Sequence, residues 1–163
     1  MSPSETATSP SPIRKPGAGS EVFDTPVVIT LSVAHMGHDV YAAFLAPLLP
    51  LLITKLSIPL AAAGALASIF RAGSLLQPLF GVWADRTDPR YFVIATPIVT
   101  AVCMSMLGVA PDFFTVALLL ALAGISASAF HPPSAATVTA VSGRTAGSGS
   151  SVFMTGGKLG MAL

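Results

Sequence analysis

The segment AHMGHDVYAAFLAPLLPLL, residues 34–52, is apolar enough to enter a membrane, yet it carries three ionisable side chains. With the residues before it, the segment forms a continuous apolar run long enough to cross a hydrocarbon core about 30 Å thick. Because a bilayer offers no water to satisfy backbone N–H and C=O groups, such a run must be helical. The sequence therefore predicts a membrane helix over residues 27–52.

The three ionisable residues of this segment are His35, His38 and Asp39, which share one helix face at positions i, i+3 and i+4. A charged Asp at the bilayer centre costs about 2.5–3.5 kcal/mol, so this face should point into the protein or toward a water-filled cavity. Burial disfavours the charged form of both residue types, which suits proton exchange. We expect Asp39 to bind a proton. The alternative is that His35 and Asp39 satisfy only each other or nearby carbonyl groups.

The rest of the chain also has the composition of a membrane protein. Of its 163 residues, 53% are hydrophobic and only 9% are charged, whereas soluble domains carry about 25% charged residues. Further membrane helices are predicted over residues 59–84, 91–109 and 113–140, and a fifth helix from residue 147 onward to 163. Ser57 is expected to be the N-cap of the second helix.

The N-terminal residues differ from this membrane domain of residues 26–163. Residues 1–25 are rich in Ser, Thr, Pro and Gly and are expected to form a disordered tail. If the tail is cytoplasmic, five basic side chains lie inside and only Lys55 lies outside, which satisfies the positive-inside rule. The five are Arg14, Lys15, Arg86, Arg90 and Arg144.

The second predicted helix holds two further candidate site residues. Arg71 stays ionised even when it is buried, so it needs an anion. That anion is either Asp39, in a structural pair between the helices, or an anionic substrate. Gln77, followed by Pro78, would add a polar group and a kink to the same helix.

The fourth predicted helix contains His131 directly before Pro132 and Pro133. The two prolines remove backbone donors, so two readings are open. Either the helix bends here with a packed histidine beside it, or it unwinds and exposes carbonyl groups toward a cavity.

The last segment, GSGSSVFMTGGKLGMAL at residues 147–163, contains Gly156 and Gly160 at a spacing that lets two helices approach closely. Lys158 lies between them and is expected to face inward. Because a helix cut off here is hard to explain in a finished protein, we expect the chain to be a fragment or a truncated product.

The chain lacks the motifs of an enzyme or of a nucleic-acid-binding protein. It has no HExxH, no glycine-rich phosphate loop, no GxSxG and no basic patch. His35, His38 and Asp39 could supply three metal ligands, but a single helical turn gives poor geometry for a tetrahedral site. We therefore expect no metal and no other cofactor.

The loop GVWADRTDPR, residues 81–90, follows the pattern G-x-x-x-D-R-x-x-x-R through Gly81, Asp85, Arg86 and Arg90. This pattern resembles the cytoplasmic loop between helices two and three of the major facilitator superfamily, with TDP where the common form has a glycine-bearing stretch. The resemblance implies a cytoplasmic gate, in which Gly81 allows close approach. The charges and a helix N-terminus would form a latch that opens on conformational change.

Three runs, FLAPLLPLL, SLLQPLFGVWAD and FHPPSAA, narrow the resemblance to the fosmidomycin-resistance branch over about residues 30–163. The resemblance implies an all-α fold of twelve helices in two six-helix halves. This chain would hold helices one to four and the start of five, and the missing C-terminal half would complete it. The implied function is proton-driven export of a drug or other small compound across the bacterial inner membrane by alternating access.

One departure from the family's drug exporters limits this resemblance. Many of them have an Arg in helix four, near the position of Leu120, and this chain has none there. Their proton-coupling scheme therefore cannot be transferred, and Arg71 or His131 is the candidate replacement.

Three alternatives to a proton-coupled exporter stay open. The chain could be a membrane protein that does not transport, or a half that needs a partner. It could be a facilitator without proton coupling. It could also be an intramembrane metal or haem protein that uses the histidines.

Overall fold

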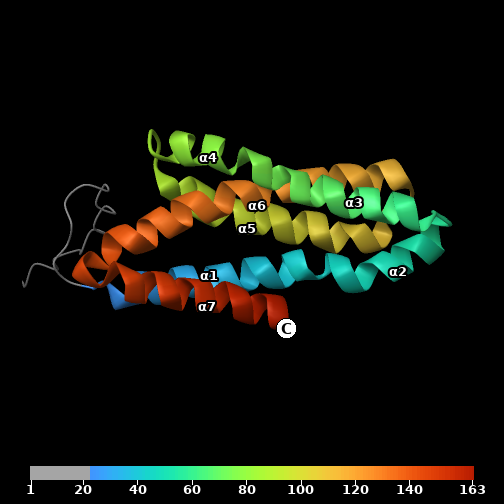
Figure 1. The fold of residues 1–163 in the computed structure, drawn as a ribbon. Coiled ribbons are helices and arrows are strands. Elements are labelled where there is room, and N and C mark those ends of the chain that lie inside the picture. The colour runs from blue at the N-terminus through green and yellow to red at the C-terminus, as the bar shows by residue number, and fades with distance from the viewer. Residues whose placement is uncertain (1–22) are drawn as a thin grey trace, which may run out of the picture.

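The computed structural model describes residues 23–163, so the predicted tail lies almost entirely outside the described residues. Within the described part, all regular structure is helical (Figure 1). Among residues 23–163, four helical stretches are long and apolar enough to cross a membrane, and α7 (Ala146–Ala162) follows them. The four stretches are Thr25–Leu56, Leu60–Ala84, Pro89–Val109 and Phe113–Val141. The predicted all-α membrane fold is confirmed.

The first stretch consists of α1 (Thr25–Ala43) and α2 (Leu45–Leu56), which meet at Phe44. Asp24 caps α1, because its carboxylate accepts a hydrogen bond of 3.2 Å from the Val27 N–H. Pro47 lacks the N–H that would bond the Ala43 carbonyl, which explains why the helix is interrupted here. The observed helix is longer than predicted at both ends.

The turn after α2 corrects the expected role of Ser57. Ser57 has a left-handed conformation, with φ of 51°, and its N–H points to the carbonyls of Ile53 and Thr54. It is therefore the C-cap of α2, and Pro59 is the residue before the next helix. Lys55 secures this end of the bundle, because its Nζ donates hydrogen bonds of 2.8 Å to the carbonyls of Gly108 and Ala110.

The second stretch consists of α3 (Leu60–Ala72), the 3₁₀ turn η1 (Gly73–Leu76) and α4 (Gln77–Ala84). The irregular turn contains Ser74, whose carbonyl the missing N–H of Pro78 would otherwise bond one turn later. Gly73 is needed for packing, since a Cβ there would overlap the backbone of Gly124 in α6. Gln77 and Pro78 thus begin a new helical segment.

The third stretch, α5 (Pro89–Met106) with η2 (Leu107–Val109), is followed by α6 (Phe113–Val141). Asp88 caps α5 and Asp112 caps α6. Of the two readings of the His131 region, the unwound one is wrong, because α6 continues as one helix through Pro132 and Pro133. The prolines remove only two consecutive backbone hydrogen bonds. Buried residues on both sides, including Phe130 and Val138, hold the helix against its neighbours.

Helix α6 is the centre of the bundle. Helices α3, α4, α5 and α7 pack against it, and α1 lies side by side with α7 and also contacts α5 and α6 (Figure 1). One apolar cluster, which includes Leu66, Met104 and Leu120, fills the end near α2. A second cluster joins α1, α6 and α7 through Leu31, Phe130 and Phe153.

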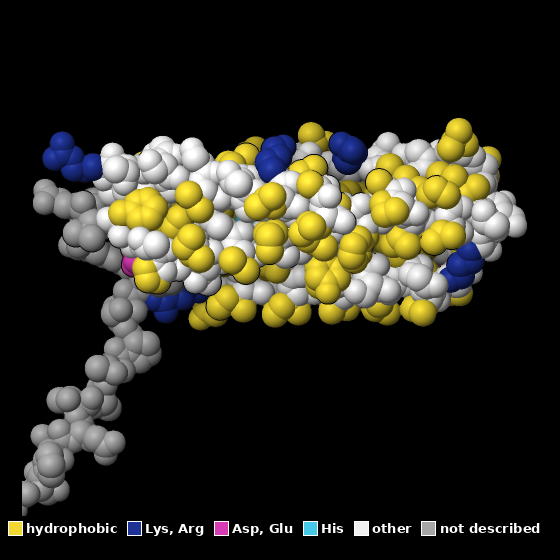
Figure 2. Space-filling model, turned by 90° about the horizontal axis from the view of Figure 1, so that it is seen from below, with side chains coloured by type: hydrophobic (Ala, Val, Ile, Leu, Met, Phe, Trp, Pro, Cys, Tyr) yellow, Lys and Arg dark blue, Asp and Glu magenta, His cyan; other side chains and the backbone are white. Residues whose placement is uncertain are grey.

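The outer surface is apolar along its length. Figure 2 shows hydrophobic side chains spread over most of the face seen there, with a few basic side chains among them. The start of α1, the α4–α5 loop and the start of α7 lie at one end of the bundle, and the α2–α3 turn lies at the other (Figure 1). Arg86, Arg90 and Arg144 are therefore at the end opposite Lys55, as the charge count requires.

Candidate functional site

The structure brings together three polar residues from two helices, which we call the His–Asp cluster: His35, Asp39 and His131. His35 and Asp39 of α1 are buried, and Nε2 of His35 lies 3.3 Å from Oδ2 of Asp39. His131 of α6 joins them, so that possible ligand atoms of all three residues lie within 4.8 Å of one another. The sequence selected all three residues but gave no reason to place His131 beside the other two.

The hydrogen bond of His35 to α7 determines what its ring can do. Nδ1 of His35 lies 2.9 Å from the backbone oxygen of Phe153, which can only accept. Nδ1 must therefore carry a hydrogen, and Nε2 of the neutral ring has a lone pair. That lone pair faces a carboxylate oxygen of Asp39. Two acceptors at this distance repel each other unless a proton or a metal ion lies between them.

His38 lies next to the His–Asp cluster and is almost completely buried, with 1% exposure. Its ring stacks on Phe130, with centroids 4.6 Å apart, and meets the His131 ring edge-on at 5.4 Å. Neither ring nitrogen has a hydrogen-bond partner among the described residues. A buried polar group without a partner is costly, which makes His38 a candidate for binding something other than the protein.

Glycines of α7 form a close seam against α1. A Cβ at Gly156 or Gly160 would overlap the backbone of Ser32 or Met36, so the two helices touch through backbone atoms. A Cβ at Gly157 would lie 2.5 Å from Cε1 of His35 and 2.8 Å from Oδ2 of Asp39. The spacing of Gly156 and Gly160 predicted close packing, but the role of Gly157 was missed. Gly157 places the α7 backbone directly over the cluster.

Arg71 and Lys158 lie outside the His–Asp cluster. Both are exposed, and within residues 23–163 neither lies within ion-pair distance of an acid. Of the two anions considered for Arg71, Asp39 is not its partner here, because α3 packs mainly on α6 while Asp39 faces His35. The inward orientation predicted for Lys158 is wrong, because the glycine face of α7 is the one that contacts α1. Gln77 is half-buried at the start of α4.

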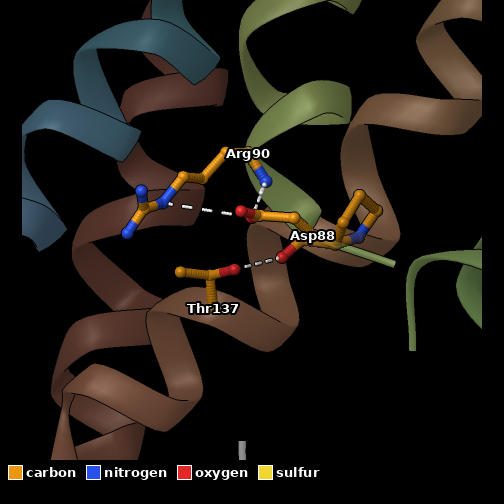
Figure 3. A network of polar contacts seen from close by, with 4 residues as sticks. Asp88, Arg90 and Thr137 are labelled. Atoms are coloured by element: carbon orange, nitrogen blue, oxygen red, sulfur yellow. Dashed lines mark hydrogen bonds and ion pairs between the residues drawn. The ribbon is translucent and has the colours of Figure 1, made fainter. Parts of the chain in front are cut away.

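The charged loop before α5 has a different character. Asp85 and Arg86 are exposed, and no opposite charge in the described part of the chain lies within 4.0 Å of either. Instead, Asp88 Oδ1 accepts a 3.0 Å hydrogen bond from the Arg90 N–H and lies 3.9 Å from its Nε. Figure 3 draws this pair together with Thr137 of α6, whose hydroxyl donates a 2.7 Å hydrogen bond to the Pro133 carbonyl. The loop pattern did not indicate a role for Asp88.

Gly81 lies where α4 passes α6. A Cβ there would be 3.6 Å from Cβ of Pro132, which is an ordinary contact distance. In this conformation the position would accept a methyl group, so the close approach expected at Gly81 is not what this arrangement requires.

Comparison with known proteins places the chain in a class. The family model described as Major Facilitator Superfamily matches residues 31–163, and the chain belongs to this family of membrane transporters. It is therefore a multi-pass membrane protein of a family that transports small molecules and not of an enzyme family, as predicted.

One matched relative gives a narrower resemblance than the family does. The chain is similar to the fosmidomycin resistance protein of Escherichia coli (strain K12), with 31% identity over 134 residues. The match covers 82% of this chain and 33% of the relative, so the chain spans about a third of that protein's length. This confirms the predicted resemblance to that branch. No solved structure matches the chain.

Proposed function

We propose that this chain is part of a proton-coupled exporter of a small compound in the bacterial inner membrane, with its N-terminus in the cytoplasm. Asp39 is the protonation site of this transporter. The observation that supports the proposal is the contact between two acceptors, Nε2 of His35 and Oδ2 of Asp39, at 3.3 Å. A proton held between them turns repulsion into a hydrogen bond, so the buried pair has a reason to bind one.

Proton release then has a mechanical consequence. Once the proton leaves, the lone pair of His35 and the charge of Asp39 repel each other inside a low-dielectric bundle. The other titratable groups that face the pair are His38 of α1 and His131 of α6, while α7 contributes Gly157. Both side chains belong to α1, so they separate only by rotating. Movement of α1 relative to α7 would permit that rotation, because it releases Nδ1 of His35 from the Phe153 carbonyl and takes Gly157 away from both side chains. This would couple the proton to alternating access.

The remaining candidate residues take roles around this step. His35, His38 and His131 border the substrate path, with Arg71 and Gln77 as further contacts. Gly81, Asp85, Arg86 and Arg90 form the cytoplasmic gate. Asp85 and Arg86 have no ion-pair partner among residues 23–163 and are available to pair in another conformation.

The proposal is tested by transport in proteoliposomes that contain the full-length protein. Fosmidomycin is the first compound to use, because it appears in the name of the relative. We expect an imposed pH gradient to drive transport by the unmodified protein. Asp39→Asn should abolish this gradient dependence, a loss of about 100-fold in coupled rate or 2.7 kcal/mol, while concentration-driven exchange persists.

Asp112→Asn is the matched control. It makes the same chemical change in an exposed cap outside the membrane helices, where Asn still accepts the hydrogen bond from Thr115. Gradient-driven transport that survives Asp39→Asn would refute the proposal. Flux of the unmodified protein that does not depend on pH would identify an uncoupled facilitator instead.

A further inference from the structure

We infer that the His–Asp cluster binds a divalent transition-metal ion, with Zn²⁺ as the reference ion, through His35, Asp39 and His131. The inference rests on the site of the proposed function but does not require proton coupling. A metal was not expected from the sequence, because one helical turn alone is a poor ligand set. The structure removes that objection, since His131 adds a third ligand from a second helix.

The spacing of the ligand atoms fits a tetrahedral ion. Bonds of about 2.0–2.2 Å at tetrahedral angles place two ligand atoms about 3.4 Å apart. Nε2 of His35 and Oδ2 of Asp39 are 3.3 Å apart, and so already match one edge of the tetrahedron. The outer limit of 4.8 Å for the whole set means that His131 has to approach by at most about 1.4 Å. A side-chain rotation of this half-buried histidine can supply that movement.

The environment of His35 is an independent argument. Histidines that bind metals almost always donate the hydrogen of the other ring nitrogen to a carboxylate or a backbone carbonyl. His35 does this through Nδ1 and the Phe153 carbonyl, which leaves the lone pair of Nε2 aimed at the cluster. The same arrangement explains why two acceptors face each other, because an ion between them attracts both.

The donor set and His38 indicate the kind of ion. Two imidazoles and one carboxylate suit Zn²⁺, Co²⁺ or Ni²⁺, whereas Mg²⁺ and Ca²⁺ prefer oxygen ligands only. Three protein ligands leave a fourth position for water or an anion. The buried, unpartnered nitrogens of His38 lie against His131 and can bond to such a water. This accounts for a buried group that otherwise has no hydrogen-bond partner in the described part of the chain.

The test is a titration of the full-length protein in detergent with Co²⁺, followed by its visible ligand-field absorption. We expect one equivalent to bind, Zn²⁺ to displace it and Mg²⁺ to leave it in place. His131→Ala should weaken the binding by about 100-fold, and Asp112→Asn should leave it unchanged. The inference is overturned if the unmodified protein binds no stoichiometric Co²⁺, or if His131→Ala binds it equally well.

A second measurement excludes simple misfolding of the variant. Zn²⁺ should raise the thermal unfolding temperature of the unmodified protein, because it binds only the folded state. The more conservative His131→Gln should unfold at a similar temperature without Zn²⁺ and show no such rise. A rise that equals that of the unmodified protein would place the metal elsewhere.

The two proposals can fail separately. Loss of proton coupling in Asp39→Asn, without Co²⁺ binding to the unmodified protein, refutes the metal site and keeps the proposed function. Metal binding that depends on His131, in a protein whose transport does not depend on the pH gradient, refutes the proposed proton coupling and keeps the metal site.

Discussion

The His–Asp cluster and the charged loop of residues 85–90 both bring acids and bases together, but in opposite surroundings. His35 and Asp39 are buried where α1, α6 and α7 meet, and the α7 backbone at Gly157 lies against both side chains. Asp85 and Arg86 are exposed, and the loop's ion pair, Arg90 with Asp88, is partly open to solvent. Electrostatic interactions are strong in the buried His–Asp cluster, whereas an exposed ion pair such as the one in the loop contributes about 0–1 kcal/mol.

This difference separates the residues that identify the family from those that can perform its chemistry. The loop is a contiguous pattern, so it can be recognised in a sequence, but its charges interact weakly in this conformation. The cluster is built from residues almost 100 positions apart, and because it is buried, its charges interact strongly with the groups around them. Substitutions in the cluster should therefore have much larger effects than substitutions in the loop.

Gly157→Ala should have a larger effect than any substitution in the seam or the loop. The added Cβ would collide with the ring of His35 and the carboxylate of Asp39, which have to move or separate. A displacement of about 1 Å at a reacting group can cost 100-fold in rate, so we expect a loss of about that size in gradient-driven transport in proteoliposomes.

Gly147→Ala is the control for this prediction, because it lies in the same helix and its Cβ would meet nothing within 4 Å. If both variants transport normally, α7 does not cover the cluster as described.

Gly160→Ala should weaken the seam between α1 and α7 without touching the cluster. Its Cβ would overlap the backbone carbonyl of Met36, and backbone cannot rotate away as a side chain can. Overpacking of this kind typically costs about 1–3 kcal/mol. Thermal unfolding in detergent measures the loss, and Gly37→Ala, with open space around its Cβ, is the matched variant in α1. Equal unfolding temperatures would contradict the seam.

Arg90→Ala should have a smaller effect, because its partner Asp88 is exposed and 3.9 Å away. An exposed pair of at most about 1 kcal/mol allows a change of no more than about fivefold in transport rate. A double-mutant cycle with Asp88→Asn isolates the pair from the capping role of Asp88. A loss as large as that of Asp39→Asn would show that the loop is as important as the cluster.

Much of the fold was predictable because it depends on local chemistry. Apolar length predicted the spans, and the positions of Asp24, Asp88 and Asp112 show why helices begin where they do. Local rules were less reliable at prolines: they left open an unwound helix at His131, where packing holds α6 together. They also placed Ser57 at the start of a helix, whereas it ends one.

The cluster was predictable only in part. Its members stood out because ionisable residues are costly in a membrane helix. Their assembly was not visible, because it depends on how closely α7 approaches α1 and on which face of α6 turns inward. The same limitation explains Arg71 and Lys158, whose charges predicted inward partners although their helix faces are exposed. Charge indicates that a residue matters, and packing decides where it points.

The smallest predicted effect concerns Asp112, which is exposed at a helix cap whereas Asp39 is buried in the bundle. Its carboxylate is fully exposed, and hydrogen bonds from the Thr115 backbone and hydroxyl lower the pKa of Asp112 below its ordinary 3.8. Because the folded pKa is the lower one, the cap stabilises α6 above about pH 3.8, and this contribution is lost as the pH falls through the folded pKa. Asn at this position caps without titrating.

The unfolding temperature of the unmodified protein should therefore fall toward that of Asp112→Asn as the pH is lowered from 7 to about 3. Thermal scans of both proteins in detergent at a series of pH values measure the difference. A constant difference would mean that the exposed carboxylate adds nothing to the cap. A difference that changes steeply with pH would mean that Asp112 responds to protons as strongly as the His–Asp cluster is proposed to do.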